Sequence, residues 1–220
     1  MKKQSGDSPI ALLRLVTWLS PAFPTGSYSY SGGLEAVYAD GLINSQSDLE
    51  DWIRNTLLRG SVWNDLVLCA ASHRNDEDFN ALCAFASALS PGNERYQETI
   101  EQGHAFLNAA KPWVANIISE TTCPLPIAVG AVARSSQIPV EMLLPIFAHA
   151  QTNSLVQAVL RMGYLGQTQG VEIMAALEGD HILAAEAAAQ STIDDLGSAT
   201  LFADLMTLRH ETTEPRIFRS

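Results

Sequence analysis

Residues 20–35 read SPAFPTGSYSYSGGLE, and this stretch separates one predicted helix from the next. Pro21 and Pro24 end a helix arriving from the N-terminal side, because proline lacks a backbone N–H and restricts the residue before it. The glycines permit unusual backbone angles, and a new helix is predicted to begin near Gly33. Tyr28 and Tyr30 combine apolar area with a polar tip. The residues alone fit a structural loop and a partner-binding surface equally well.

On both sides of this loop, apolar residues recur with the spacing of helices, and alternation typical of strands is scarce. Ser47 and Glu50 form a capping box that opens one such helix. Cys69 and His73, four residues apart, are expected on another. The fold class predicted is all-α: one globular domain over residues 1–220 with about ten helices, and with flexible tails at 1–8 and 209–220 in the free protein. Further helices are predicted at 10–19, 76–89, 94–110, 112–119, 126–135, 139–163, 171–178, 181–190 and 198–208.

The composition limits the classes of function. Hydrophobic residues make up 47% of the 220 positions, which excludes a disordered chain, and the formal net charge is −11. Nucleic acids and anionic membranes both require concentrated positive charge, so neither is an expected partner. Three cysteines without a CxxC spacing indicate buried thiols in a reducing compartment. No signal peptide or membrane span is recognisable, and a cytoplasmic protein is expected.

Residues 121–170 are poor in charge, since only Arg134, Glu141 and Arg161 are charged there. Helices without charge seldom have a fully solvated face. Two explanations stay open: these are the central helices of the fold, or a second subunit covers them. A symmetric dimer is therefore expected.

Sequence motifs that would indicate catalysis are missing. There is no phosphate-binding loop, dinucleotide-binding turn or nucleophile elbow. His210-Glu211 begins like a zinc-protease helix but lacks the second histidine, and residues 76–80 begin like a calcium loop that then lacks its glycine and its last glutamate. Cys69 and His73 are too few to hold a metal. No catalytic residue and no metal site are predicted, so the protein is not expected to be an enzyme.

The loop resembles the N-terminal signature of the UreF family of urease accessory proteins, and residues 215–220, PRIFRS, resemble the end of that family. Weaker family patterns are similar to residues 126–130 and 160–167. The resemblance runs along the whole chain in order. The loop residues that fit are Ser20, Pro21, Pro24, Gly26, Tyr30, Ser31, Gly33, Leu34 and Glu35.

This resemblance implies an all-helical, dimeric, cytoplasmic chaperone of nickel metallocentre assembly. Such a protein bridges a UreD-type protein (also called UreH) and a UreG-type GTPase, and it couples GTP hydrolysis to nickel insertion into the urease apoprotein. Nickel and GTP are then handled by the partners, and no tightly bound cofactor is expected.

The partner-binding residues are predicted in the two terminal motifs. In the tail, Phe218 would anchor the segment and two arginines would pair with carboxylates, docking the tail when the UreD-type partner binds. The loop would line a contact surface near the dimer axis. The predicted partner-binding residues are Pro21, Pro24, Gly26, Tyr28, Tyr30, Gly33, Glu35, Arg216, Phe218, Arg219 and Ser220.

Two alternatives belong to other classes of protein. The first is a small-molecule-binding helical domain, or a cofactor-dependent enzyme, with a pocket at Tyr28, Tyr30 and Glu35. The second is a dimeric structural module without partners. The lack of catalytic motifs weakens the first alternative, and the two terminal motifs weaken the second.

Overall fold

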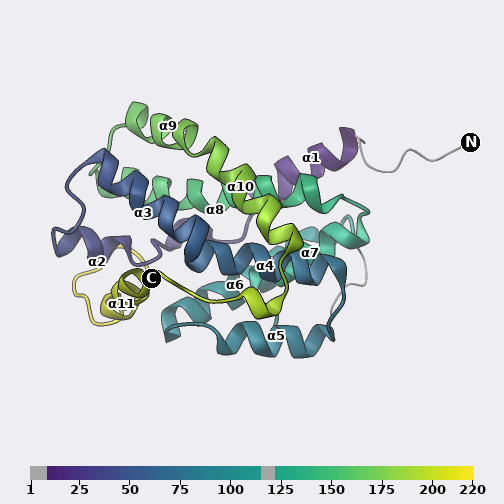
Figure 1. Cartoon of the computed structure of the whole chain (residues 1–220). Coiled ribbons are helices and arrows are strands. Elements are labelled where there is room, and N and C mark those ends of the chain that lie inside the picture. Colours follow the sequence, from purple (N-terminus) through teal and green to yellow (C-terminus); the bar gives the residue numbers. More distant parts are fainter. Residues whose placement is uncertain (1–8, 115–121) are drawn as a thin grey trace, which may run out of the picture.

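The computed structural model describes residues 9–114 and 122–220, which form one all-helical domain without strands in those ranges (Figure 1). This confirms the predicted fold class. Two 3₁₀ turns, η1 (Ser27–Ser29) and η2 (Ile193–Asp195), lie between helices. The helices are α1 (Pro9–Trp18), α2 (Leu34–Ala39), α3 (Gln46–Arg59), α4 (Ser61–Arg74), α5 (Phe79–Ala88), α6 (Asn93–Ala110), α7 (Leu125–Ser135), α8 (Val140–Met162), α9 (Gln167–Ala176), α10 (Glu178–Gln190) and α11 (Leu201–His210).

The centre of the fold is the packing of α4 against α7, with α6, α8 and α10 around them. Gly130 of α7 permits this close approach, because a Cβ atom there would collide with the backbone carbonyl of Cys69 in α4. Both helices are buried on most sides. Burial within the chain therefore accounts for the shortage of charge in α7. It does not account for residues 161–169, none of which is buried, and the dimer stays a prediction.

A second apolar cluster joins α2, α3, the end of α8 and α9. Leu34 and Val37 of α2 are fully buried in it, together with Ile53 of α3, Val159 of α8 and Ile173 of α9. This cluster fixes the helix that follows the glycine-rich loop. The loop is thereby held between α2 and the body of the domain.

Several predicted helix limits need correction. The N-cap of α3 is Ser45, two residues before the predicted cap Ser47. The Ser45 side chain accepts a hydrogen bond from the N–H of Asp48, and the Asp48 carboxylate accepts one from the N–H of Asn44. The helix predicted at 112–119 lies mostly outside the described residues, and its first three residues are not helical. Residues 1–8 also lie outside. The three cysteines are free and buried, as predicted.

Candidate functional site: the loop–tail seam

The two family-like motifs lie against each other although they come from opposite ends of the chain. Ser31 donates hydrogen bonds from its N–H and from its hydroxyl to the backbone oxygen of Ser220, both at 2.6 Å. The N–H of Arg219 donates to the carbonyl of Ser29 at 2.8 Å. The loop thus supplies partners for the backbone of the last two residues. The flexible tail expected at 209–220 in the free protein stays a prediction. We call this contact the loop–tail seam: residues 28–35, His210 and 216–220, with Glu94, Glu98 and Glu101 of α6.

Glu35 is the central acceptor of the seam. It is buried in the first turn of α2, where its carboxylate accepts hydrogen bonds from the N–H of Ile217 at 2.7 Å and of Phe218 at 2.9 Å. The Nε2 atom of His210 lies 3.1 Å away. Burial alone would raise the pKa of Glu35, but the two N–H groups and the imidazole outweigh it, so the pKa is lowered. An ionised Glu35 therefore holds the tail's backbone.

Gly33 brings Glu35 into this position. It precedes α2 in the left-handed region, with φ of 80°, which favours glycine. A Cβ atom at Gly33 would lie 3.0–3.1 Å from backbone and side-chain atoms of Thr207. The missing side chain lets α2 begin directly beside α11, so that His210 reaches Glu35.

A second carboxylate lies on the far side of the His210 ring. Glu94, in the first turn of α6, is buried and lies 2.7 Å from Nδ1 of His210. Its other carboxylate oxygen accepts a hydrogen bond from the Arg216 guanidinium. The two ring nitrogens of His210 thus contact one carboxylate each, Glu94 at Nδ1 and Glu35 at Nε2. The trio joins α2, α6 and α11 beneath the tail.

Tyr30 and Arg219 meet at Glu101 of α6. The Tyr30 hydroxyl donates to Glu101 at 2.8 Å, and the Arg219 guanidinium donates to both carboxylate oxygens at 2.6 and 2.9 Å. The guanidinium also lies over the Tyr30 ring, 5.6 Å from its centre. Burial and the neighbouring Glu101 raise the pKa of Tyr30, whereas hydrogen bonds from Arg219 and Tyr30 lower the pKa of Glu101. This cluster fixes the last turn of the tail.

Phe218 is the buried apolar side chain of the tail. Its ring is 4% exposed, and the Arg161 guanidinium lies 4.7 Å from the ring centre. Arg161 also donates a hydrogen bond to the Tyr28 carbonyl, and burial lowers its pKa. Arg161 thereby links the end of α8 to both motifs.

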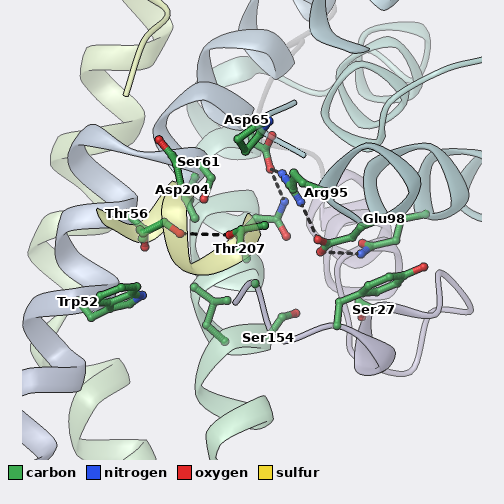
Figure 2. Close-up of a pocket in the computed structure, with 18 residues that line it drawn as sticks. Ser27, Trp52, Thr56, Ser61, Asp65, Arg95, Glu98, Ser154, Asp204 and Thr207 are labelled. Carbon is green, nitrogen blue, oxygen red and sulfur yellow. Dashed lines mark hydrogen bonds and ion pairs between the residues drawn. The ribbon is translucent and has the colours of Figure 1, made fainter. Parts of the chain in front are cut away.

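The seam continues inward into a buried ionic cluster. The Ser220 hydroxyl donates to Glu98 at 3.2 Å, and Glu98 pairs with Arg95 at 3.3 Å. Arg95 pairs in turn with Asp65 of α4 at 2.5 Å, and Gln151 donates to the same carboxylate (Figure 2). Burial raises the pKa of Asp65 although Arg95 opposes it. A cavity of about 70 Å³ borders this cluster, which is room for a few water molecules.

Pro21, Pro24 and Gly26 lie outside the seam, and Tyr28 takes part through its backbone carbonyl. Pro21 and Pro24 are exposed, and Gly26 has φ of 77° before η1. Tyr28 is 71% exposed. Tyr30 lines the cavity beside the ionic cluster, whereas Tyr28 and Glu35 do not line it. This cavity therefore does not join the three residues named under the small-molecule alternative.

Several seam residues were not predicted from the sequence. Ser31 and Arg161 stood within family-like patterns, and His210 was considered only as a zinc ligand. The three α6 glutamates follow one another at helical spacing (i, i+4, i+7) and so share one face, but spacing alone does not distinguish a binding face from a solvated one. The unpredicted residues are Ser31, Glu94, Glu98, Glu101, Arg161 and His210.

Within the described ranges, no group of three or more His, Cys, Asp or Glu side chains is arranged to hold a metal ion. No helix there is both long and apolar enough to cross a membrane. Fold and seam together define a helical protein whose two terminal motifs form a single surface.

Comparisons with known proteins agree with this class. A family model described as UreF matches residues 43–178. Proteins named urease accessory protein UreF are 47% identical over 215 residues in Rhizobium etli and 49% identical over 216 residues in Rhizobium johnstonii, with 96% of both chains covered in each case. A protein of the same name from Brucella ovis is 45% identical over 98% of this chain and 97% of its own. The chain belongs to the UreF family.

Proposed function

We propose that this chain is a non-catalytic chaperone of nickel metallocentre assembly in urease. In this role it bridges a UreD-type protein and a UreG-type GTPase, and it couples GTP hydrolysis to nickel insertion. The observation that carries the proposal is the loop–tail seam, because the two motifs most similar to the family meet there. The relatives' printed name, urease accessory protein, supports the same role.

The seam suits a contact surface because it fixes side chains that still point outward. Tyr28 and Ile217 are 71% and 74% exposed, yet each is adjacent to backbone held by hydrogen bonds. Rigid aromatic and arginine side chains are typical of the residues that dominate binding energy. Docking a partner there would cost little conformational entropy.

In this role nickel is the ion that is delivered and GTP hydrolysis drives the delivery. We assign the binding of nickel and of GTP to the partners. The chain itself would position the GTPase relative to the UreD-type protein and to the urease apoprotein. A homodimer would present two such surfaces. The compartment proposed is the cytoplasm.

Light scattering on a sizing column tests the bridge directly. The chain is measured alone, with a matched UreD-type protein, with a matched UreG-type GTPase, and with both. A ternary complex that forms only when this chain is present supports the proposal. Partners that associate equally well without it contradict the bridging role.

Two variants test whether the complex forms through the seam. Deletion of residues 216–220 and substitution Tyr30→Ala should both weaken complex formation while the helical content stays unchanged. Leu183→Ala on the exposed side of α10 is the control. Full complex formation by both seam variants would show that the seam is not the contact surface.

A further inference from the structure

Helix α11 buries two polar side chains and exposes four of its five large apolar ones; the fifth, Met206, packs against the second apolar cluster. Thr207 and His210 point inward and are buried. Surface helices normally place apolar side chains inward and polar ones outward. The large apolar side chains on the outward side of α11 are Leu201, Phe202, Leu205 and Leu208, exposed by 70, 50, 46 and 40%.

The seam explains why the inward side is polar. His210 is required between Glu35 and Glu94, and Thr207 packs against Gly33. These contacts fix the rotation of α11 about its axis. The apolar residues then face solvent, although none of the seam contacts depends on them.

The outward side has the spacing of a helix-binding row. Leu201, Leu205 and Leu208 follow an i, i+4, i+7 pattern, which places them in line along one face. Trp52 of α3 extends the row sideways, with its ring 6.1 Å from that of Phe202 in an edge-on arrangement. We call Trp52 and the four outward residues of α11 the α11 face.

Charge and area indicate what covers this face. Asp204 is half-buried between the row and the cavity of Figure 2, which it helps to line, and its carboxylate has no hydrogen-bond or ion-pair partner among the described residues. A segment carrying Lys or Arg would be attracted to this carboxylate and to a chain with net charge −11. Five partly exposed side chains also fall short of the roughly 800 Å² per partner that a standard stable interface buries. A single helix from a larger partner fits the face better than a homodimer contact.

We propose that the α11 face docks an amphipathic helix of a partner protein, with apolar residues at helical spacing and a Lys or Arg that pairs with Asp204. This inference rests on the proposed function, because a bridge requires two separate surfaces. The seam presents one surface around Tyr28 and Ile217, and the outward side of α11 presents the other.

The test uses the full-length chain with each matched partner in turn, the UreD-type protein and the UreG-type GTPase, by titration calorimetry. Leu205→Asp should weaken binding of one partner at least tenfold, and Asp204→Lys should weaken the same partner. Val171→Asp is the matched control, since Val171 is 69% exposed on α9. Hydrogen exchange should show that residues 201–208 of the wild-type chain become protected when that partner is added.

The outcomes distinguish a failure of the docking face from a failure of the bridging role. Wild-type binding that persists in Leu205→Asp, without protection of residues 201–208, overturns the docking face and leaves the bridging role intact. A wild-type chain that binds neither partner refutes both. A change in self-association of Leu205→Asp, seen by sedimentation, would assign the face to a homodimer and overturn the proposal.

Discussion

The α4–α7 core and the loop–tail seam hold the same molecule together by opposite means. The core joins helices by apolar contact and by a glycine that lets two backbones touch. The seam joins segments up to 189 residues apart through carboxylates, arginines and backbone N–H groups. Apolar contact tolerates changes of pH and salt, whereas paired charges depend on both. The fold should therefore persist under conditions that open the seam.

Disrupting the packing of α4 against α7 should lower the free energy of unfolding more than any change in the seam. Gly130→Ala places a methyl group against the Cys69 carbonyl, and we expect the free energy of unfolding to fall by about 3 kcal/mol in urea titrations. Gly179→Ala is the control, because Gly179 lies in α10 with open space around it. Equal stability of the two variants would show that α4 and α7 are not tightly packed.

Breaking the seam at its central acceptor should have a smaller and more local effect. Glu35→Ala leaves the N–H groups of Ile217 and Phe218 without an acceptor, and we expect a loss of about 2–3 kcal/mol. Hydrogen exchange at these two amides should become fast while α4 and α7 stay protected. Continued protection of both amides would show that the tail is held by other contacts.

Acid should separate the two regions without any mutation. Because the pKa of Glu35 is lower when folded than when unfolded, its contribution is complete above the unfolded value of about 4.3 and is lost as pH falls through the folded value. The tail amides should lose protection in that range before the helical circular dichroism signal falls. Simultaneous loss of both signals would contradict the separation. Glu35→Gln, which cannot ionise, should remove most of the pH dependence of tail protection.

The contacts that Tyr30 and Arg219 make with Glu101 should contribute least to the free energy of unfolding. Tyr30→Phe removes one hydrogen bond to Glu101, worth about 1 kcal/mol, and Arg219→Ala removes a largely exposed ion pair worth less than about 1 kcal/mol. Thermal unfolding of the two variants checks this order. A larger effect of Arg219→Ala would mean that its contact with the Tyr30 ring outweighs the hydroxyl.

The core helices could be predicted from the sequence because the spacing of apolar residues within one helix is a local pattern. The buried positions of α3, such as Leu49, Ile53 and Leu57, recur at helical spacing, so the periodicity of the sequence indicates both helix and buried face. Helix α4 was harder to delimit, because burial on most of its surface removes the contrast between two faces. The start of α3 was misplaced because two serines, Ser45 and Ser47, both suit a helix cap.

The seam was predictable only in part. Family-like motifs marked Glu35, Phe218 and Arg219, but their pairing depends on contacts across almost the whole chain. Glu101 and His210 carry no local signal, since an acidic residue on a helix usually faces solvent and a histidine near a helix end usually caps it. A flexible tail is the default expectation for a terminus and stays a prediction for the free protein, and the sequence alone did not indicate the contacts of residues 217 and 218 with Glu35.

The sequence separation of Glu35 and Ile217 also determines the delay between the synthesis of the two residues. These residues are 182 positions apart, and at a synthesis rate of about 5–20 residues per second the ribosome adds the second roughly 10–40 s after the first. During that interval α2 and the early helices emerge while the Glu35 carboxylate has only water to bind. The surface that presents Tyr28 and Ile217 together therefore cannot form until residues 217 and 218 have been synthesised, because their N–H groups are the ones that Glu35 holds.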